Sequence, residues 1–217
     1  MSDDPQNWST LSGEKVKELE RWGSAWADLQ HAGMALFERQ QLPRRPSSLF
    51  QRRALWESAV VAYARADQSK DRRDIQFKNF VQEITGDSGS AMHKRVMDWR
   101  HGHVAHRKRA EFESAETVIA FRNGSATPSS LHLVLGIDLG PEDDSEFVAA
   151  FRQHVEVLRN AMYETRISPL AKQIIDNINE SKIVIPSEMR PADDQSSSAR
   201  YVINHLLLTL DAVPKTD

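Results

Sequence analysis

The sequence has no cysteine among its 217 residues, which excludes disulfides, zinc–thiolate sites and cysteine nucleophiles. It also has no apolar run close to the roughly 20 residues that a membrane-spanning helix needs, so no membrane contact is expected. The amino-terminal residues are acidic and polar, which is not the pattern of a secretory signal. Together these absences favour a reducing compartment, and we predict a cytoplasmic protein.

An excess of positive charge is also absent. The chain has 28 Lys and Arg against 31 Asp and Glu, a formal net charge of -3. This balance argues against broad, non-specific binding of nucleic acid. A local basic patch can still act, because salt screening makes nearby charges matter more than the total. Apolar residues make up 40% of the chain, which is enough for one sizeable core.

Apolar residues at steps of three and four predict helices over most of the chain. We expect helices over 11–41 and 47–68, a short helix over 75–84 that ends in a loop at 85–90, and another helix from 90 onward. A further helix is expected from about Ser145, with Ser168 capping a new or kinked segment that continues to about Ser181. The stripe expected on the first helix is Val16, Leu19, Trp22, Trp26, Leu29, Met34 and Phe37.

The period of the pattern changes after Glu116. Thr117–Phe121 and Leu131–Ile137 are rich in β-forming residues and are separated by turn-forming residues, which predicts an antiparallel hairpin. A two-stranded hairpin is marginal alone, so it must pack on the helices or pair with another chain. We therefore predict a mainly α fold: a helical bundle over 1–185 with one inserted β-hairpin around 117–137, then a linker and a carboxy-terminal helix within 186–217.

The most unusual stretch is 93–109, HKRVMDWRHGHVAHRKR, with four of the eight histidines, six Lys or Arg residues and one acid. Histidine is the side chain that most readily exchanges a proton near neutral pH, and Arg100 supplies a fixed cation suited to a phosphate. In a straight α-helix Arg100 and His106 would lie roughly 120° apart. Gly102 favours a break or a loosened turn, which would let both side chains face one cleft.

In such a cleft, one histidine would remove the 2′-OH proton of an RNA ribose or protonate the 5′-oxygen leaving group. Arg100 would hold the phosphate and stabilise its developing charge. This chemistry needs no metal and no cofactor, and none is expected. A metal site at His101, His103 and His106 is less favoured, because no carboxylate or cysteine completes a ligand set. A third interpretation is a solvated surface without function.

Within this stretch, Arg100-His101-Gly102-His103-Val104-Ala105-His106 resembles the signature of the HEPN superfamily. That signature is an Arg, then four to six residues, then a His, with a polar residue commonly directly after the Arg. The local form is similar to the R-[DN]-x-x-x-A-H variant of abortive-infection-type and uncharacterised bacterial HEPN-like proteins. A looser similarity covers Leu49 to Phe121.

The resemblance implies an all-α bundle of four or five helices that is usually a homodimer, with both motifs facing a shared cleft. Many members are endoribonucleases, often toxins with an antitoxin partner or phage-defence proteins, and RNA would be the substrate. The alternative is a non-catalytic HEPN-like module that binds a nucleotide or a protein. By carry-over, Arg100 and His106 are the catalytic pair and His101 assists them. The residues expected to contact the substrate are His93, His103 and Arg107.

Overall fold

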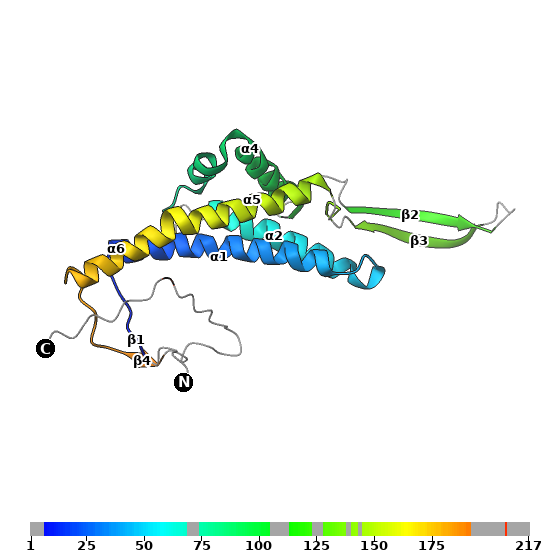
Figure 1. Cartoon of the computed structure of the whole chain (residues 1–217). Helices are drawn as coiled ribbons and strands as arrows, with labels where there is room; N and C mark the ends of the chain where they lie inside the picture. The colour runs from blue at the N-terminus through cyan, green and yellow to red at the C-terminus, as the bar shows by residue number, and fades with distance from the viewer. Residues whose placement is uncertain are drawn as a thin grey trace. The chain divides into compact units, whose positions relative to one another are not determined.

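The computed structural model describes residues 7–68, 74–104, 113–122, 128–137, 140–142, 145–191 and 207. These residues are mostly helical, with small two-stranded antiparallel sheets (Figure 1). The chain divides into two compact units, Ala25–Asn160 and a second formed by Met1–Ser24 with Ala161–Asp217. The boundaries lie within α1 (Glu14–Gln41) and near the end of α5 (Glu146–Met162). Apart from Leu207, the carboxy-terminal helix expected within 186–217 lies outside the described residues.

The unit of residues 25–160 is built mainly from helices that are joined by side-chain hydrogen bonds. The helices expected over 11–41 and 47–68 are confirmed as α1 and as α2 (Leu49–Gln68), which follows a 3-10 turn, η1 (Pro46–Ser48). Two hydrogen bonds tie α1 to α5, from Arg152 Nη1 to Gln40 Oε1 at 2.7 Å and from Arg159 Nη1 to Gln30 Oε1 at 3.5 Å. Figure 1 shows these two helices side by side. No helix among the described residues has the length and apolar character to cross a bilayer.

The buried face of α1 differs from the expected stripe. Met34 and Phe37 belong to that stripe but are more than half exposed, so the buried face does not include them. The helix instead buries alanines and leucines, and at Gly33 it lies against α5: a Cβ there would be in ordinary van der Waals contact, 3.8 Å from Val155 Cγ1. The buried apolar residues of α1 within this unit are Ala25, Leu29, Ala32, Ala35 and Leu36.

The third helix, α4 (Phe77–Trp99), contains a sharp kink where a loop was expected. Only Gly86 leaves the helical conformation, with φ 62° and ψ -154°, so the rest of the expected loop at 85–90 is helical. Glycine adopts this conformation at little cost because it has no Cβ. After the kink the chain packs tightly, since a Cβ on Gly89 would lie 1.7 Å from Thr85 Oγ1. The kink changes the direction of the second half of α4, which leads into the motif that begins at Arg100.

The predicted hairpin is confirmed. Strand β2 (Glu113–Phe121) pairs antiparallel with β3 (Pro128–Ile137), and the register places Thr117 opposite Leu133. Next along the chain, α5 begins where it was expected, because Ser145 Oγ accepts a hydrogen bond from Val148 N–H as an N-cap.

The other unit contains a short strand pair and the last described helix. β1 (Asn7–Trp8) pairs antiparallel with β4 (Arg190–Pro191). The wide turn η3 (Tyr163–Ile167) leads directly into α6 (Ser168–Asn179). Ser168 was expected to be an N-cap, but its φ of -60° and ψ of -44° are helical. The helix therefore needs no cap, because the π-helical turn η3 continues directly into it. Pro169 lies in the first turn of α6 and has no N–H that needs a partner.

Candidate functional site

The motif begins at the residue where α4 ends. Arg100–Val104 form a π-helical turn, η2, directly after Trp99. The loosened turn expected at Gly102 is therefore confirmed, without a break: Gly102 has no positive φ, and a Cβ placed on it would meet nothing within 4 Å. Turns of this kind are rare and are frequent at functional sites, since the widened backbone redirects its side chains.

Arg100 and His101 are the motif residues whose side chains the structure describes. Arg100 is half-buried and His101 is exposed, and Arg100 Nη1 lies 3.4 Å from His101 Nδ1. A guanidinium can only donate, so His101 Nδ1 is the acceptor in this contact. Within the described ranges no carboxylate lies at ion-pairing distance from Arg100. This guanidinium can therefore receive a phosphate without breaking an ion pair seen in the structure.

Buried aromatic rings support the start of the motif. Trp99, the residue before Arg100, meets Trp56 of α2 edge-on at 5.4 Å between ring centroids and stacks on Phe147 of α5 at 6.4 Å. Trp56 is fully buried, and α2 packs against both α4 and η2. Arg95 places its guanidinium 4.4 Å from the centroid of the Phe147 ring. Three helices thus fix the position of Trp99, and with it the backbone of Arg100.

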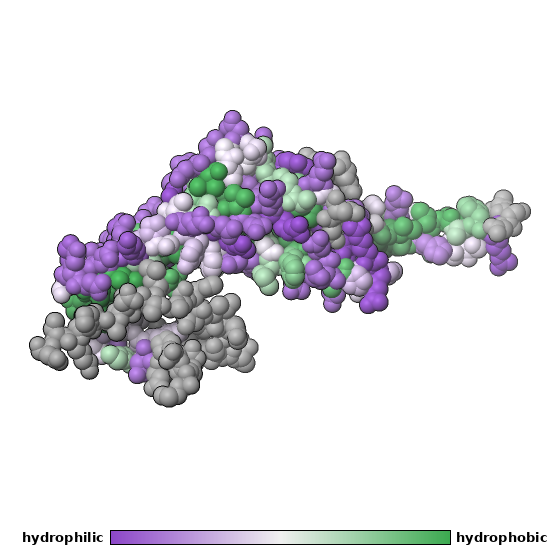
Figure 2. All heavy atoms as spheres, in the orientation of Figure 1, coloured by the Kyte–Doolittle hydropathy of each residue, from purple (hydrophilic) through white to green (hydrophobic). Residues whose placement is uncertain are grey.

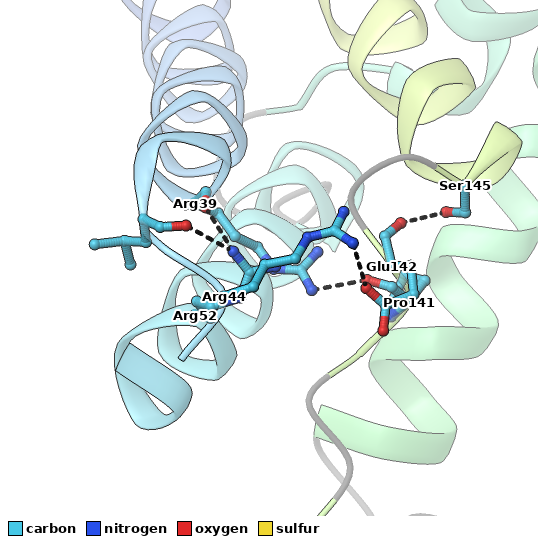
Figure 3. Close-up of polar contacts among 7 residues, drawn as sticks. Arg39, Arg44, Arg52, Pro141, Glu142 and Ser145 are labelled. Atoms are coloured by element: carbon cyan, nitrogen blue, oxygen red, sulfur yellow. Dashed lines mark hydrogen bonds and ion pairs between the residues drawn. The ribbon is translucent and has the colours of Figure 1, made fainter. Parts of the chain in front are cut away.

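A second group of arginines in the same unit is structural. Figure 3 shows Arg39, Arg44 and Arg52 pointing toward protein acceptors. Arg39 Nη2 donates to Pro141 O at 2.7 Å, Arg52 Nη1 donates to Leu42 O at 3.0 Å, and Arg44 pairs with a carboxylate at 3.4 Å. These bonds hold the end of α1 and the start of α2 to the segment that precedes α5. We therefore do not count these cations as a phosphate site.

His93 was expected to contact the substrate, but the structure places it in the core. Its side chain is only 6% exposed, and its Nδ1 lies 2.9 Å from the Tyr63 hydroxyl of α2. The same hydroxyl lies 2.9 Å from His154 Nε2 of α5. This buried polar cluster of Tyr63, His93 and His154 joins three helices. We remove His93 from the candidate substrate contacts, because a bound RNA would not reach it.

The cluster has a consistent arrangement of protons. Asp67 Oδ2 lies 3.8 Å from His93 Nε2 and favours a proton on that nitrogen, which leaves His93 Nδ1 to accept from Tyr63 O–H. The Tyr63 oxygen then accepts from His154 Nε2–H. Burial raises the pKa of Tyr63, lowers that of His93, and, with a smaller contribution from His93, lowers that of His154 to about 4. Both imidazoles are therefore neutral at pH 7.

The remaining motif residues lie outside what the structure describes. His106 and Arg107 are beyond the described ranges, and so is the side chain of His103, so a cleft shared by Arg100 and His106 stays a prediction. Among the described residues, no three His, Cys, Asp or Glu side chains gather as metal ligands would. Sequence reasoning missed His154, although its signal was present: it lies on the apolar stripe of α5, three residues after Phe151 and next to Val155.

No protein-family model matches the chain, and neither a curated protein nor a solved structure is similar to it. The resemblance to the HEPN superfamily therefore depends on the motif from Arg100 to His106 and on the looser similarity around it. Any function proposed for the chain has to be argued from its own residues and tested on them.

Two glycines give a matched test of the local geometry. Gly102→Ala is expected to change the free energy of unfolding by less than about 1 kcal/mol, because the new Cβ meets nothing. Gly140→Ala is expected to lower it by about 2 kcal/mol or more, because Gly140 has φ +83° and the Cβ would lie 2.6 Å from Trp56 Cδ1. Urea unfolding followed by circular dichroism measures both. Equal losses of unfolding free energy in the two variants would contradict the different surroundings of these two glycines.

The buried polar cluster predicts acid sensitivity. The folded protein binds a proton at His154 less readily than the unfolded chain does, because the folded pKa is about 4 and the unfolded value is about 6.5. The free energy of unfolding is therefore independent of His154 above pH 6.5. It decreases as the pH falls toward 4, by up to about 3 kcal/mol. Urea unfolding between pH 7 and 5 should show a weaker pH dependence in His154→Phe than in wild type. Parallel curves would mean that His154 is not buried as described.

Proposed function

We propose that the protein is a HEPN-like, metal-independent endoribonuclease in which Arg100 and His106 carry the reaction. The observation that most supports this is the placement of Arg100. Its half-exposed guanidinium lies in a π-helical turn next to an exposed histidine, and buried rings fix the residue before it. Such a guanidinium can hold two phosphate oxygens at once with a geometry that ammonium groups do not match.

In the proposed reaction, His106 takes the 2′-OH proton as general base while the 2′-oxygen attacks the adjacent phosphorus. The bond from phosphorus to the 5′-oxygen then breaks, leaving a 2′,3′-cyclic phosphate and a 5′-hydroxyl. The leaving 5′-oxygen takes a proton from water, and His101 assists Arg100 at the phosphate. Arg100 stabilises the negative charge that develops on the non-bridging oxygens. His103 and Arg107 would contact the flanking phosphates.

On the resemblance, we further propose that the enzyme acts in the cytoplasm as a toxin or a phage-defence protein. An enzyme that cleaves cellular RNA damages its own cell unless something restrains it. A protein partner of antitoxin type is the restraint that the family pattern implies.

The proposal is tested by incubating the purified protein with single-stranded RNA in EDTA. Wild type should cleave the RNA, and Arg100→Ala and His106→Ala should not, with circular dichroism spectra unchanged. Lys94→Ala is the matched control, because Lys94 is an exposed cation on the same half of α4, and it should cleave like wild type. If wild type cleaves none of a varied set of RNAs, the enzyme proposal fails and the non-catalytic binding module replaces it.

A further inference from the structure

The β-hairpin has one face made almost entirely of apolar side chains. The register pairs Ala115 with Leu135, Thr117 with Leu133 and Ile119 with Leu131, and cross-strand partners point to the same side of a sheet. The opposite face is mixed, with Glu116, Val118, His132 and Val134, and Ser130 Oγ lies 2.6 Å from His132 Nε2. Alternation of this kind is typical of a sheet that is covered on one side only.

The apolar face is uncovered within the described part of the chain. Leu131, Leu133 and Leu135 are 70%, 65% and 61% exposed, and Ile119 is 53% exposed. Figure 2 shows hydrophobic residues along the side of the hairpin that it draws. Exposed apolar faces of this size on a soluble protein commonly mark a contact with another molecule. A lone two-stranded hairpin also needs such a contact for stability.

We propose that this apolar face of β2 and β3 binds the same face of a second copy of this chain. The first reason is shape. One row of the face has the large side chains Leu131, Leu133 and Leu135 on β3, and the other row has Ala115, Thr117 and Ile119 on β2. A two-fold axis parallel to the strands places β3 of each copy over β2 of the other. Leu133 and Leu135 of each copy then lie over the small residues of the partner, and Leu131 packs on Ile119, as a self-complementary interface requires.

The second reason is charge. The three facing pairs at the centre of this face carry no charged side chain, so two identical faces meet there without the repulsion that like charges would cause. The same absence argues against a nucleic acid as the occupant, because the phosphate backbone is bound mainly through Lys and Arg. This interface is separate from the motif-to-motif dimer that the family resemblance implies.

The area indicates how strong the contact is. Ten residues at about 3.4 Å each, on two strands about 4.8 Å apart, give a flat face of roughly 340 Å² per copy, or about 700 Å² for two copies. Stable complexes bury about 1,200–2,000 Å² in total. The hairpin contact falls below that range, so the dimer forms reversibly and its population depends on protein concentration.

The test is analytical ultracentrifugation of the full chain at concentrations from about 1 to 300 μM, a range that covers weak dissociation constants. Wild type should shift from monomer to dimer as the concentration rises. Leu133→Lys should raise the dissociation constant at least about tenfold, because it places a charge in the interface of both copies. Val134→Lys is the matched control: it adds the same charge at the next residue, on the opposite face, and should dimerise like wild type.

Leu131→Ser is a milder change on the same face, and it keeps the test decisive if Leu133→Lys disturbs the fold by circular dichroism. It too should weaken the dimer. A wild type that stays monomeric at every concentration overturns the proposal, and so does equal weakening by Leu133→Lys and Val134→Lys. A monomeric wild type that sediments with phosphatidylcholine vesicles, and loses this binding in Leu133→Lys, would assign the face to lipid instead.

Discussion

Arg100→Ala is expected to lower the rate of RNA cleavage by about 1,000-fold, the upper end of what removal of one charge-stabilising donor costs. The expected size follows from the role given to this residue, which holds the phosphate and meets charge that appears only in the transition state. Arg100→Lys keeps the charge but loses the planar fork of donors, so a loss of about 30- to 100-fold is expected. A cleavage rate that falls from Arg to Lys to Ala at this position indicates a side chain that binds the phosphate through two donors.

Initial rates in EDTA on a fluorescent single-stranded RNA measure this ranking. The variants should keep the circular dichroism spectrum and the unfolding midpoint of wild type, because Arg100 makes no described contact beyond His101 that supports the core. Arg100→Ala with the wild-type rate would remove Arg100 from the mechanism. Equal rates in Arg100→Lys and wild type would reduce its role to one of general charge.

Trp56→Ala is expected to lower the free energy of unfolding by about 4 kcal/mol, within the range for a buried tryptophan. Trp56 is 0% exposed and meets three rings edge-on, those of Trp99, Phe147 and Phe151, at 5.4 to 6.0 Å. The guanidinium of Arg39 lies 5.3 Å from its centroid. Since whole domains are stable by only about 5–15 kcal/mol, this one change would remove a large share of the stability.

Trp56→Phe is the matched control and is expected to cost only about 1–2 kcal/mol. The replacement keeps an aromatic ring, and it forfeits no hydrogen bond, because Trp56 Nε1 has no acceptor among the described residues. Urea unfolding followed by circular dichroism separates the two variants. If Trp56→Ala cost less than 1 kcal/mol, the ring would not be central to the packing of α2, α4 and α5.

Much of the fold can be predicted from the periodicity of apolar residues, and the predictions that failed did so for physical reasons. Steps of three and four located α1, α2 and α5, and strand-forming residues around a turn located the hairpin. On α1 the apolar stripe included Met34 and Phe37, which the fold leaves more than half exposed, and omitted the buried Ala25, Ala32 and Ala35. Large apolar residues dominate such a pattern, whereas alanines contribute little to it. The extent of the loop around Gly86 was overestimated because glycine and serine also occur within helices.

The candidate site was predictable in part. The density of cations and histidines located the segment and Arg100, and the loosened turn at Gly102 was expected from its conformational freedom. Helical arithmetic places His93 and Arg100 within about 20° of each other, which made His93 look like a second site residue. That arithmetic could not show that Tyr63 and His154, 30 residues before and 61 after His93, would meet its ring in the core.

RNA cleavage through the 2′-hydroxyl without a metal leaves characteristic ends on its products, so the ends that wild type produces are the decisive measurement. A labelled single-stranded RNA would be incubated in EDTA beside the same sequence with 2′-O-methyl riboses, and the products analysed by mass spectrometry. We expect cleavage of the unmodified RNA alone, with 2′,3′-cyclic phosphate and 5′-hydroxyl ends. Cleavage of the methylated strand, 3′-hydroxyl and 5′-phosphate ends, or activity that appears only when Mg²⁺ is added would contradict the proposed reaction.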